Sequence, residues 1–146
     1  MKKTAYRLLL YFFSKFFKTD DLADKFPVSV KAIIIDNDRV LCLKNERGEW
    51  DLPGGKIDFN EDIEKCLKRE VKEEVNLEIK NLNILKPFNL KFNDVAVLVL
   101  VYTAEISCES PINVSYEHSE YNFFSKAEIK NLNIPQNYKD LFENLI

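Results

Sequence analysis

From residue 26 onward, the spacing of hydrophobic positions changes along the chain and predicts several short strands and helices. Residues 28–35 are rich in β-branched side chains, and residues 39–43 form a second apolar run. Because turn residues separate them, the two runs predict a β-hairpin. Further strands are expected at residues 77–87, with a bulge or bend, at 95–106 and at 120–124. The uninterrupted apolar run at 95–106 is typical of a central strand buried on both faces.

Residues 61–75 show a different spacing, which predicts an amphipathic helix. Apolar side chains recur every four positions, at Ile63, Leu67, Val71 and Val75. Asn76 follows, and asparagine tolerates the left-handed conformation found just past many helix ends.

The end of the chain predicts two more helices. Ser125 is a suitable N-cap for a short helix, and Pro135 is expected to start a last helix over residues 136–145. This order of elements predicts an α/β fold of the α+β type, a sandwich with a mixed sheet, over residues 26–146.

Residues 1–25 predict a separate N-terminal amphipathic helix. A polar stripe of Arg7, Tyr11, Lys15 and Lys18 crosses an otherwise apolar surface. Such a helix must bury a wide face against its own domain, against a second copy in a homodimer, or, as the less favoured alternative, at a membrane surface. The segment is too short and too charged to span a membrane and has no signal-peptide cleavage pattern.

Composition narrows the class of protein. The chain has 146 residues, with 21 Lys and Arg against 24 Asp and Glu. This near balance argues against a dedicated nucleic-acid binder, but it allows a small anionic substrate because a bound metal reverses the local charge. Cys42, Cys66 and Cys108 form no metal-binding pattern and are expected to be reduced thiols of a cytoplasmic protein.

The predicted helix at 61–75 carries acids where apolar side chains are expected. On a helical wheel, Glu70 and Glu74 fall inside the apolar sector and Glu73 lies at its edge. Inward carboxylates repel each other and lose hydration unless something compensates. Glu70 and Glu74 are one turn apart, so both can reach one hard cation, Mg²⁺ first and Mn²⁺ second. From the helix alone, a solvated acidic face balanced by lysines is an equal alternative.

Glycine is scarce and concentrated in front of this helix. The chain has only three glycines, Gly48, Gly54 and Gly55, within eight positions. Loop glycines let the backbone approach an ion or a phosphate closely. Gly55 lies six residues before Glu61, so the loop leads directly into the acidic helix.

The spacing of these residues resembles the box of the Nudix hydrolase family. That box reads G, five residues, E, seven residues, R-E, an aliphatic, any residue, E-E, any residue, G and an aliphatic. The chain matches it from Gly55 to Leu77, with Asn76 in place of the last glycine. The matching positions are Gly55, Glu61, Arg69, Glu70, Val71, Glu73, Glu74, Val75 and Leu77.

The resemblance implies a Nudix-type α/β/α sandwich and a role for each box residue. Glu70 and Glu74 would ligate the metal with the backbone carbonyl of Gly55, and Glu73 would join directly or through water. Arg69 would orient the glutamates, with Glu61 as its structural ion-pair partner.

The general base is not fixed by the box, because it varies within the family. Residues 115–121 are similar to a Glu-His-x-x-Tyr stretch found in several branches, so Glu117 is favoured as the base over Glu120, and Glu73 is a further catalytic candidate. His118 either assists or is a neutral structural residue.

Residues that recognise the substrate are not identified by the sequence. The aromatic candidates for stacking a base, each more readily explained as core, are Phe88, Phe92, Tyr102 and Phe123. Trp50 is expected to pack at the base of the glycine loop.

The resulting expectation is Mg²⁺-dependent hydrolysis of the phosphoanhydride bond of a nucleoside diphosphate linked to another moiety. Nucleoside triphosphates, dinucleoside polyphosphates and nucleotide sugars all fit this description. Two alternatives stay open: a module that senses nucleotides with little turnover, and a membrane or partner adaptor that acts through the N-terminal helix.

Overall fold

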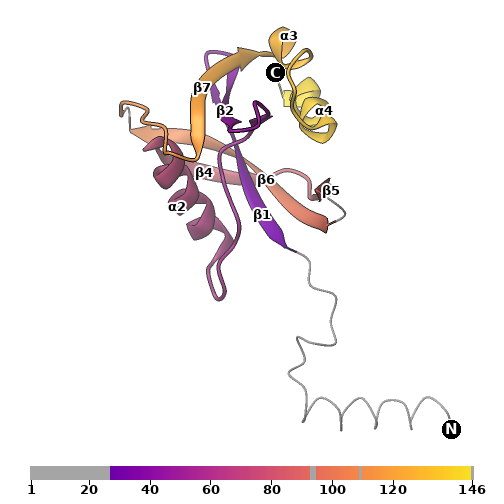
Figure 1. Ribbon diagram of the computed structural model, residues 1–146. Helices are drawn as coiled ribbons and strands as arrows, with labels where there is room; N and C mark the ends of the chain where they lie inside the picture. The colour runs from indigo at the N-terminus through magenta and orange to yellow at the C-terminus, as the bar shows by residue number, and fades with distance from the viewer. Residues whose placement is uncertain (1–26, 93–94, 109, 146) are drawn as a thin grey trace, which may run out of the picture.

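The computed structural model describes residues 27–92, 95–108 and 110–145 (Figure 1), so the helix predicted for residues 1–25 lies outside it. The strands are β1 (Val28–Asp36), β2 (Arg39–Asn45), β3 (Trp50–Asp51), β4 (Glu78–Ile84), β5 (Phe88–Phe92), β6 (Val95–Cys108) and β7 (His118–Ser125). The helices are α2 (Ile63–Val75), α3 (Lys126–Ile129) and α4 (Gln136–Leu145). None of these described helices is long and apolar enough to cross a membrane.

The sheet is mixed, as predicted, and β6 lies within it. β1 pairs in parallel with β6, whereas β4 and β5 both pair with β6 in the antiparallel direction. The bulge or bend predicted within residues 77–87 is confirmed, because the pairing of β4 with β6 shifts register between Glu78 and Ile79 and again between Lys80 and Asn83. β3 and β5 are two short strands that the sequence patterns did not predict.

The predicted hairpin of β1 and β2 is confirmed and joins two parts of the sheet. The two strands pair antiparallel only beside the turn, through Ile35 with Val40 and Asp36 with Arg39. Beyond these pairs they diverge, so that β1 continues beside β6 while β2 pairs with β3 and β7.

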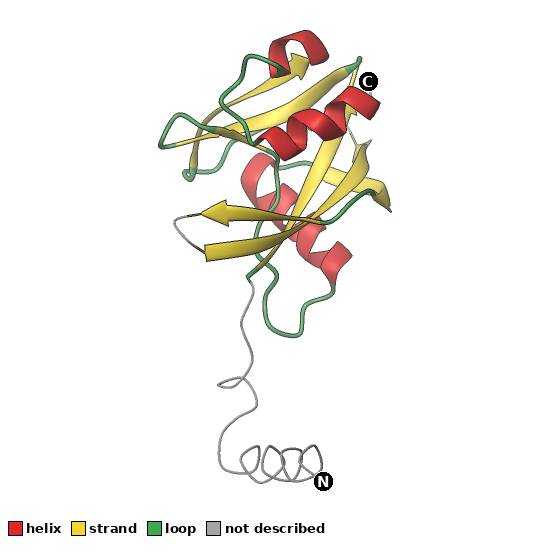
Figure 2. Ribbon diagram, turned by 90° about the vertical axis from the view of Figure 1, so that its right-hand side faces the viewer, coloured by secondary structure: helices red, strands yellow, loops and turns green. Residues whose placement is uncertain are grey.

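Two apolar cores cover the two faces of the sheet, because side chains alternate along each strand. One core joins Val30, Ala32 and Ile34 of β1 to buried residues of α2. The other joins Ile33 to Tyr138 and Phe142 of α4. The views from two sides show α2 and α4 on opposite sides of the central strands (Figures 1 and 2), which gives the expected α/β/α layers.

Helix α2 begins two residues later than predicted. The side chain of Asp62 accepts hydrogen bonds from the amides of Glu64 and Lys65, so Asp62 is the N-cap and Glu61 stays in the preceding loop. Ile63, expected in the apolar sector, is 37% exposed because it lies on the first, solvent-facing turn. Asn76 ends the helix with φ of 60°, as the prediction of a left-handed residue required.

Candidate functional site

The glycine loop, residues 52–55, is attached to strand β1 by hydrogen bonds. The amide of Ala32 donates to the carbonyl of Pro53 at 2.8 Å, and the amide of Val30 donates to the carbonyl of Gly55 at 2.9 Å. The hydroxyl of Ser29 donates to the same Gly55 oxygen at 3.1 Å. The Gly55 carbonyl, predicted as a metal ligand, therefore accepts two hydrogen bonds within the fold, and it would have to exchange one of them to bind an ion.

Both glycines of this loop occupy positions where a side chain would collide. Gly54 has φ of 125°, and a Cβ atom there would overlap the carbonyl oxygen of Val30. A Cβ on Gly55 would overlap the carboxylate of Glu70. The special backbone need inferred from the scarcity of glycine is thus a close approach of the loop to β1 on one side and to α2 on the other.

Three of the four acids of α2, Glu70, Glu73 and Glu74, differ in burial as the helical wheel predicts. Glu74 is buried, with 7% of its surface exposed, and one of its carboxylate oxygens accepts a hydrogen bond from the Gly54 amide at 2.7 Å. The side chain of Glu70 is 17% exposed, and that of Glu73 is 60% exposed. Burial raises the pKa of Glu74 to about 7, which Lys31 and the Gly54 amide only partly oppose.

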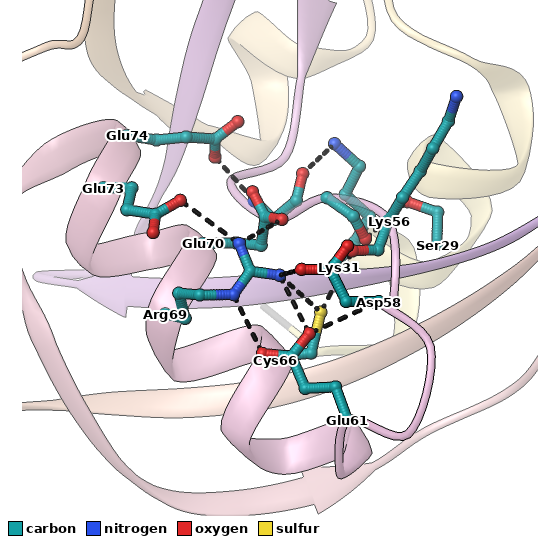
Figure 3. A network of polar contacts seen from close by, with 12 residues as sticks. Ser29, Lys31, Lys56, Asp58, Glu61, Cys66, Arg69, Glu70, Glu73 and Glu74 are labelled. Atoms are coloured by element: carbon teal, nitrogen blue, oxygen red, sulfur yellow. Dashed lines mark hydrogen bonds and ion pairs between the residues drawn. The ribbon is translucent and has the colours of Figure 1, made fainter.

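Arg69 connects these acids to the loop, as Figure 3 shows. Its guanidinium forms two parallel contacts with Glu61, at 2.8 and 2.9 Å. Another nitrogen reaches Glu70 at 2.8 Å and Glu73 at 3.2 Å. These hydrogen bonds from Arg69 lower the pKa of Glu61 to about 2. The contacts agree with the orienting function that the resemblance implies for Arg69 and with a structural function for Glu61.

The carboxylate oxygens of Glu70, Glu73 and Glu74 are ligands that suit a hard divalent cation. Each of Glu70, Glu73 and Glu74 directs one oxygen to a protein donor. Their other oxygens accept no hydrogen bond from the described part of the chain, so three carboxylate oxygens on one helix are available to an ion. Among the described residues, no three acidic, histidine or cysteine side chains are already gathered as ligands around one point. The carboxylates would therefore have to turn slightly from Arg69 to converge.

These acids line a cleft of about 1030 Å³, which is large enough for a nucleotide-sized ligand. Glu117 also lines this cleft, from the loop before β7. Glu120 does not line the cleft: its side chain pairs with Lys44 at 3.4 Å on the outer part of β7. Of the two acids proposed as the base outside the helix, the structure places only Glu117 beside the helix acids.

His118 lies deeper in the same cleft. Its side chain is 11% exposed, and its Nε2 atom is 3.7 Å from Glu74. Burial and the nearby ammonium of Lys31 lower the pKa of His118, so the ring is neutral at pH 7. Its Nδ1 atom and the buried hydroxyl of Ser115 have no hydrogen-bond partner among the described residues. Both polar atoms belong to residues that line the cleft, where substrate or water can satisfy them.

Lys31 is the site residue that sequence analysis missed. Its ammonium contacts Asp51 at 2.8 Å and the carbonyls of Gly54 and Leu52 at 2.6 and 3.0 Å. Burial alone would lower the pKa of Lys31, but the carboxylates of Asp51 and Glu74 outweigh it and raise the pKa. A lysine within the buried run Val30 to Ile34 was the available signal, since lysine in a strand core requires a partner.

Three of the four aromatic candidates for base stacking, Tyr102, Phe88 and Phe123, are not among the described residues that line the cleft. Tyr102 is buried in the core beneath α2, Phe88 contacts Tyr138 edge-on at 5.6 Å, and Phe123 packs against the α2 core. The side chain of Phe92 is outside the described set. Trp50 packs edge-on against Phe124 at 4.6 Å, which confirms its predicted packing role. The described cleft lining contains two other aromatic residues, Tyr116 and Tyr138, and the aliphatic residues Pro27, Leu90, Val95, Val97 and Val99.

Comparison with known proteins agrees with this geometry. The NUDIX domain family matches residues 25–145. A MutT protein from Methanosarcina mazei Go1 superposes with a TM-score of 0.73 and 28% identity, over 83% of this chain and 93% of that one. A MutT NUDIX hydrolase from Burkholderia pseudomallei gives a TM-score of 0.75 at 23% identity, over 84% and 100% of the two chains.

A more distant likeness shows the same fold. An Ap4A hydrolase from C. elegans superposes with a TM-score of 0.71 at 18% identity, over 82% of this chain and 94% of that one. No curated protein matches the chain. Because the family match covers most of the sequence and includes the loop, the helix acids and the cleft, this chain belongs to the NUDIX domain family and is a pyrophosphohydrolase of the Nudix type.

Proposed function

We propose that this enzyme hydrolyses the phosphoanhydride bond of a nucleoside diphosphate linked to another moiety, with Mg²⁺ as its cofactor and Mn²⁺ as a substitute. Members of the family generally use divalent metal ions and small nucleotide substrates. The observation that carries the proposal is the set of three glutamates on α2, each with one available oxygen at the cleft.

Different residues of the cleft are proposed to bind the metal, to orient its ligands and to accept a proton. Glu70, Glu73 and Glu74 would hold the ion, which supplies neutralisation of diphosphate oxygens and of the charge that develops in an in-line displacement at phosphorus. Arg69 binds one oxygen of Glu70 and one of Glu73, which leaves the other oxygen of each for the ion. Glu117, which lines the same cleft, is the proposed acceptor of the proton from the attacking water.

The shape of the cleft supports a substrate with a part beyond the phosphates. The acids of α2 line the cleft together with Leu90 of β5 and with Val97 and Val99 of β6. Apolar side chains of this kind suit a planar nucleobase, because contact with them removes its apolar faces from water. Dinucleoside polyphosphates, nucleotide sugars and nucleoside triphosphates share that base and the phosphoanhydride bond.

A substrate panel tests this function. Purified enzyme is incubated with Mg²⁺ and, in turn, nucleoside triphosphates, a dinucleoside polyphosphate and a nucleotide sugar, and phosphate is measured after addition of pyrophosphatase or phosphatase. We expect Mg²⁺-dependent turnover of at least one compound. Binding of nucleotides without turnover of any of them would instead support the sensing alternative.

We also propose a cytoplasmic location for this protein. Cys42 and Cys66 are buried, and burial raises the pKa of each thiol to about 12, so both stay protonated and unreactive. Such thiols suit a reducing compartment.

A further inference from the structure

Lys31 places a buried positive charge beside the acid cluster, and the proposed chemistry does not use it directly. Its side chain is 12% exposed. An ammonium has three N–H donors, and three acceptors surround this one: the Asp51 carboxylate and the carbonyls of Leu52 and Gly54. All of its donors are therefore directed at the protein, and none is left for a substrate phosphate.

Two of the three acceptors of Lys31 belong to one short loop, residues 52–55, and the third, Asp51, is the last residue of β3 just before it. Each of the four successive carbonyls from Leu52 to Gly55 accepts a hydrogen bond from β1. Backbone amides of β1 bind those of Pro53 and Gly55, and the Lys31 ammonium binds the other two. One side chain thus supplies the attachment of half of the loop carbonyls to the strand.

The same loop holds a carboxylate on its other side. The amide of Gly54 donates to Glu74 at 2.7 Å, while the carbonyl of Gly54 accepts from Lys31 at 2.6 Å. The Gly54 amide shares its planar peptide unit with the Pro53 carbonyl, which accepts a hydrogen bond from the Ala32 amide. Lys31 binds the Leu52 and Gly54 carbonyls, which belong to the peptide units immediately before and after this one. Loss of both contacts would leave the Gly54 unit held to β1 by the Ala32 amide alone, so that its amide could move away from Glu74.

We propose that Lys31 is a positioning residue for the candidate metal site. It anchors the glycine loop to β1 so that the Gly54 amide holds Glu74 in place before an ion binds. The role of Glu74 in this inference rests on the proposed function, whereas the anchoring of the loop is independent of it. Metal affinity alone is a poor test, since loss of Lys31 would remove a repulsive charge and displace the loop at the same time.

The scarcity of glycine provides a direct probe. Full-length protein labelled only with ¹⁵N-glycine gives backbone amide signals from Gly48, Gly54 and Gly55. Proline labelled with ¹³C at its carbonyl identifies the Gly54 signal, since Gly54 is the one glycine preceded by a proline. Gly48 lies in the turn before β3, where its amide donates to Asn45 at 3.0 Å, and serves as an internal reference.

Amide hydrogen exchange is measured without metal in wild type, Lys31→Met, Lys31→Arg and the control Lys80→Met. Lys80 is an exposed residue of β4, so its replacement removes the same charge away from the loop. We expect exchange of the Gly54 amide to accelerate at least tenfold in Lys31→Met and less in Lys31→Arg, with Gly48 unchanged throughout. Lys80→Met should match wild type.

A second measurement separates positioning from general stability. Urea unfolding gives the global stability of each variant. Unchanged Gly54 exchange in Lys31→Met, or acceleration no greater than the loss of global stability accounts for, would overturn the anchoring. At saturating Mg²⁺ and substrate, we expect kcat of Lys31→Met to fall at least tenfold with KM within threefold of wild type. A loosened Gly54 amide with unchanged kcat would overturn the positioning role.

These readouts keep two failures apart. If the wild type hydrolyses no nucleotide, the proposed function fails, yet the exchange of Gly54 in the metal-free protein still decides whether Lys31 anchors the loop.

Discussion

Arg69 binds Glu61 through two parallel contacts while it also reaches Glu70 and Glu73. A guanidinium is suited to this because its donors form a rigid planar fork. One end of the fork is thereby held by the loop, and the other end sets the direction of two proposed metal ligands. The importance of Glu61 lies in this indirect positioning.

A double-mutant cycle tests the pairing. We expect Arg69→Lys and Glu61→Gln each to lower kcat at saturating Mg²⁺, by at least tenfold for the arginine variant, since lysine keeps the charge but loses the fork. Because both act through one contact, the double variant should be within about threefold of the weaker single variant. Losses that simply multiply in the steady-state assay would show that the two residues act independently.

Ionisation of Glu74 is expected to make the free energy of unfolding depend on pH. Its pKa is raised by burial to about 7 in the folded protein, from roughly 4.3 in an unfolded chain. The folded state therefore binds the proton more tightly, and this contribution to the free energy of unfolding is present below about pH 4.3 and lost as the pH rises through 7. Glu74→Gln stays neutral over the whole range.

We expect metal-free Glu74→Gln to be more stable than wild type at pH 8.5, on the order of 2 kcal/mol, and closer to wild type at pH 4.5. Urea unfolding in the presence of a chelator measures both values. A variant less stable than wild type at pH 8.5 would contradict the assignment of Glu74 as a buried, unfavourably ionised carboxylate.

At the scale of elements, the glycine loop and α2 form one unit, because Gly54 and Gly55 fill the space between β1 and the helix acids. Gly54→Ala would drive a Cβ atom into the Val30 carbonyl, whereas a Cβ at Gly48 meets no atom within 4 Å. Both residues have positive φ, so Gly48→Ala controls for backbone strain alone.

We expect Gly48→Ala to lower the free energy of unfolding by about 1 kcal/mol, and Gly54→Ala to lower it by at least about 2 kcal/mol more, with loss of turnover. Chemical unfolding and the nucleotide assay check the pair. Equal stability of the two variants would mean that the loop can move away from β1 without harm.

The sequence predicted those elements whose signal is local. Turn residues predicted the hairpin, apolar periodicity predicted α2, and Asn76 predicted its left-handed end. Each of these signals lies within or directly beside the element that it predicts. The short strand β5 was not predicted because its five residues carry no strong strand pattern. They form a strand by pairing with β6. Local patterns also misplaced the start of α2, since the cap depends on the orientation of Asp62.

The candidate site was predictable where the box fixes spacing and unpredictable where folding brings distant segments together. Glu70, Glu73 and Glu74 share one helix, so their relative positions follow from its geometry. The choice between Glu117 and Glu120 depends on where β7 starts, and Lys31 meets Glu74 only through the Gly54 loop. No spacing in the sequence encodes such long-range contacts.

At the scale of the whole molecule, the family match runs from residue 25 to 145 and does not include the first 24 residues. Within the part of the chain that the structure describes, the cleft is lined by residues from Pro27 to Tyr138, all of them inside the matched region. We therefore expect deletion of residues 1–24 to leave kcat/KM within about threefold of the full chain. A loss of more than tenfold, at an unchanged thermal midpoint, would make the extension part of the active enzyme.

The same deletion bears on the adaptor alternative. Sedimentation and liposome binding of the full and shortened chains would reveal a dimer or membrane contact that depends on the extension. If neither property changes on deletion, the predicted helix has no such function.

One cleft is lined by residues of β1, β2, the glycine loop and α2. Both acidic and aliphatic side chains line it. The central claim is that this cleft hydrolyses a phosphoanhydride with an ion held by the glutamates of α2. Its most direct test is Mg²⁺-dependent phosphate release by Glu74→Gln, measured on the best substrate of the wild type. Glu64→Gln is the control, because Glu64 lies on the first turn of the same helix outside the cleft lining. We predict that Glu74→Gln folds and loses at least 100-fold in kcat, while Glu64→Gln keeps wild-type activity. Activity of Glu74→Gln within threefold of wild type would contradict the account.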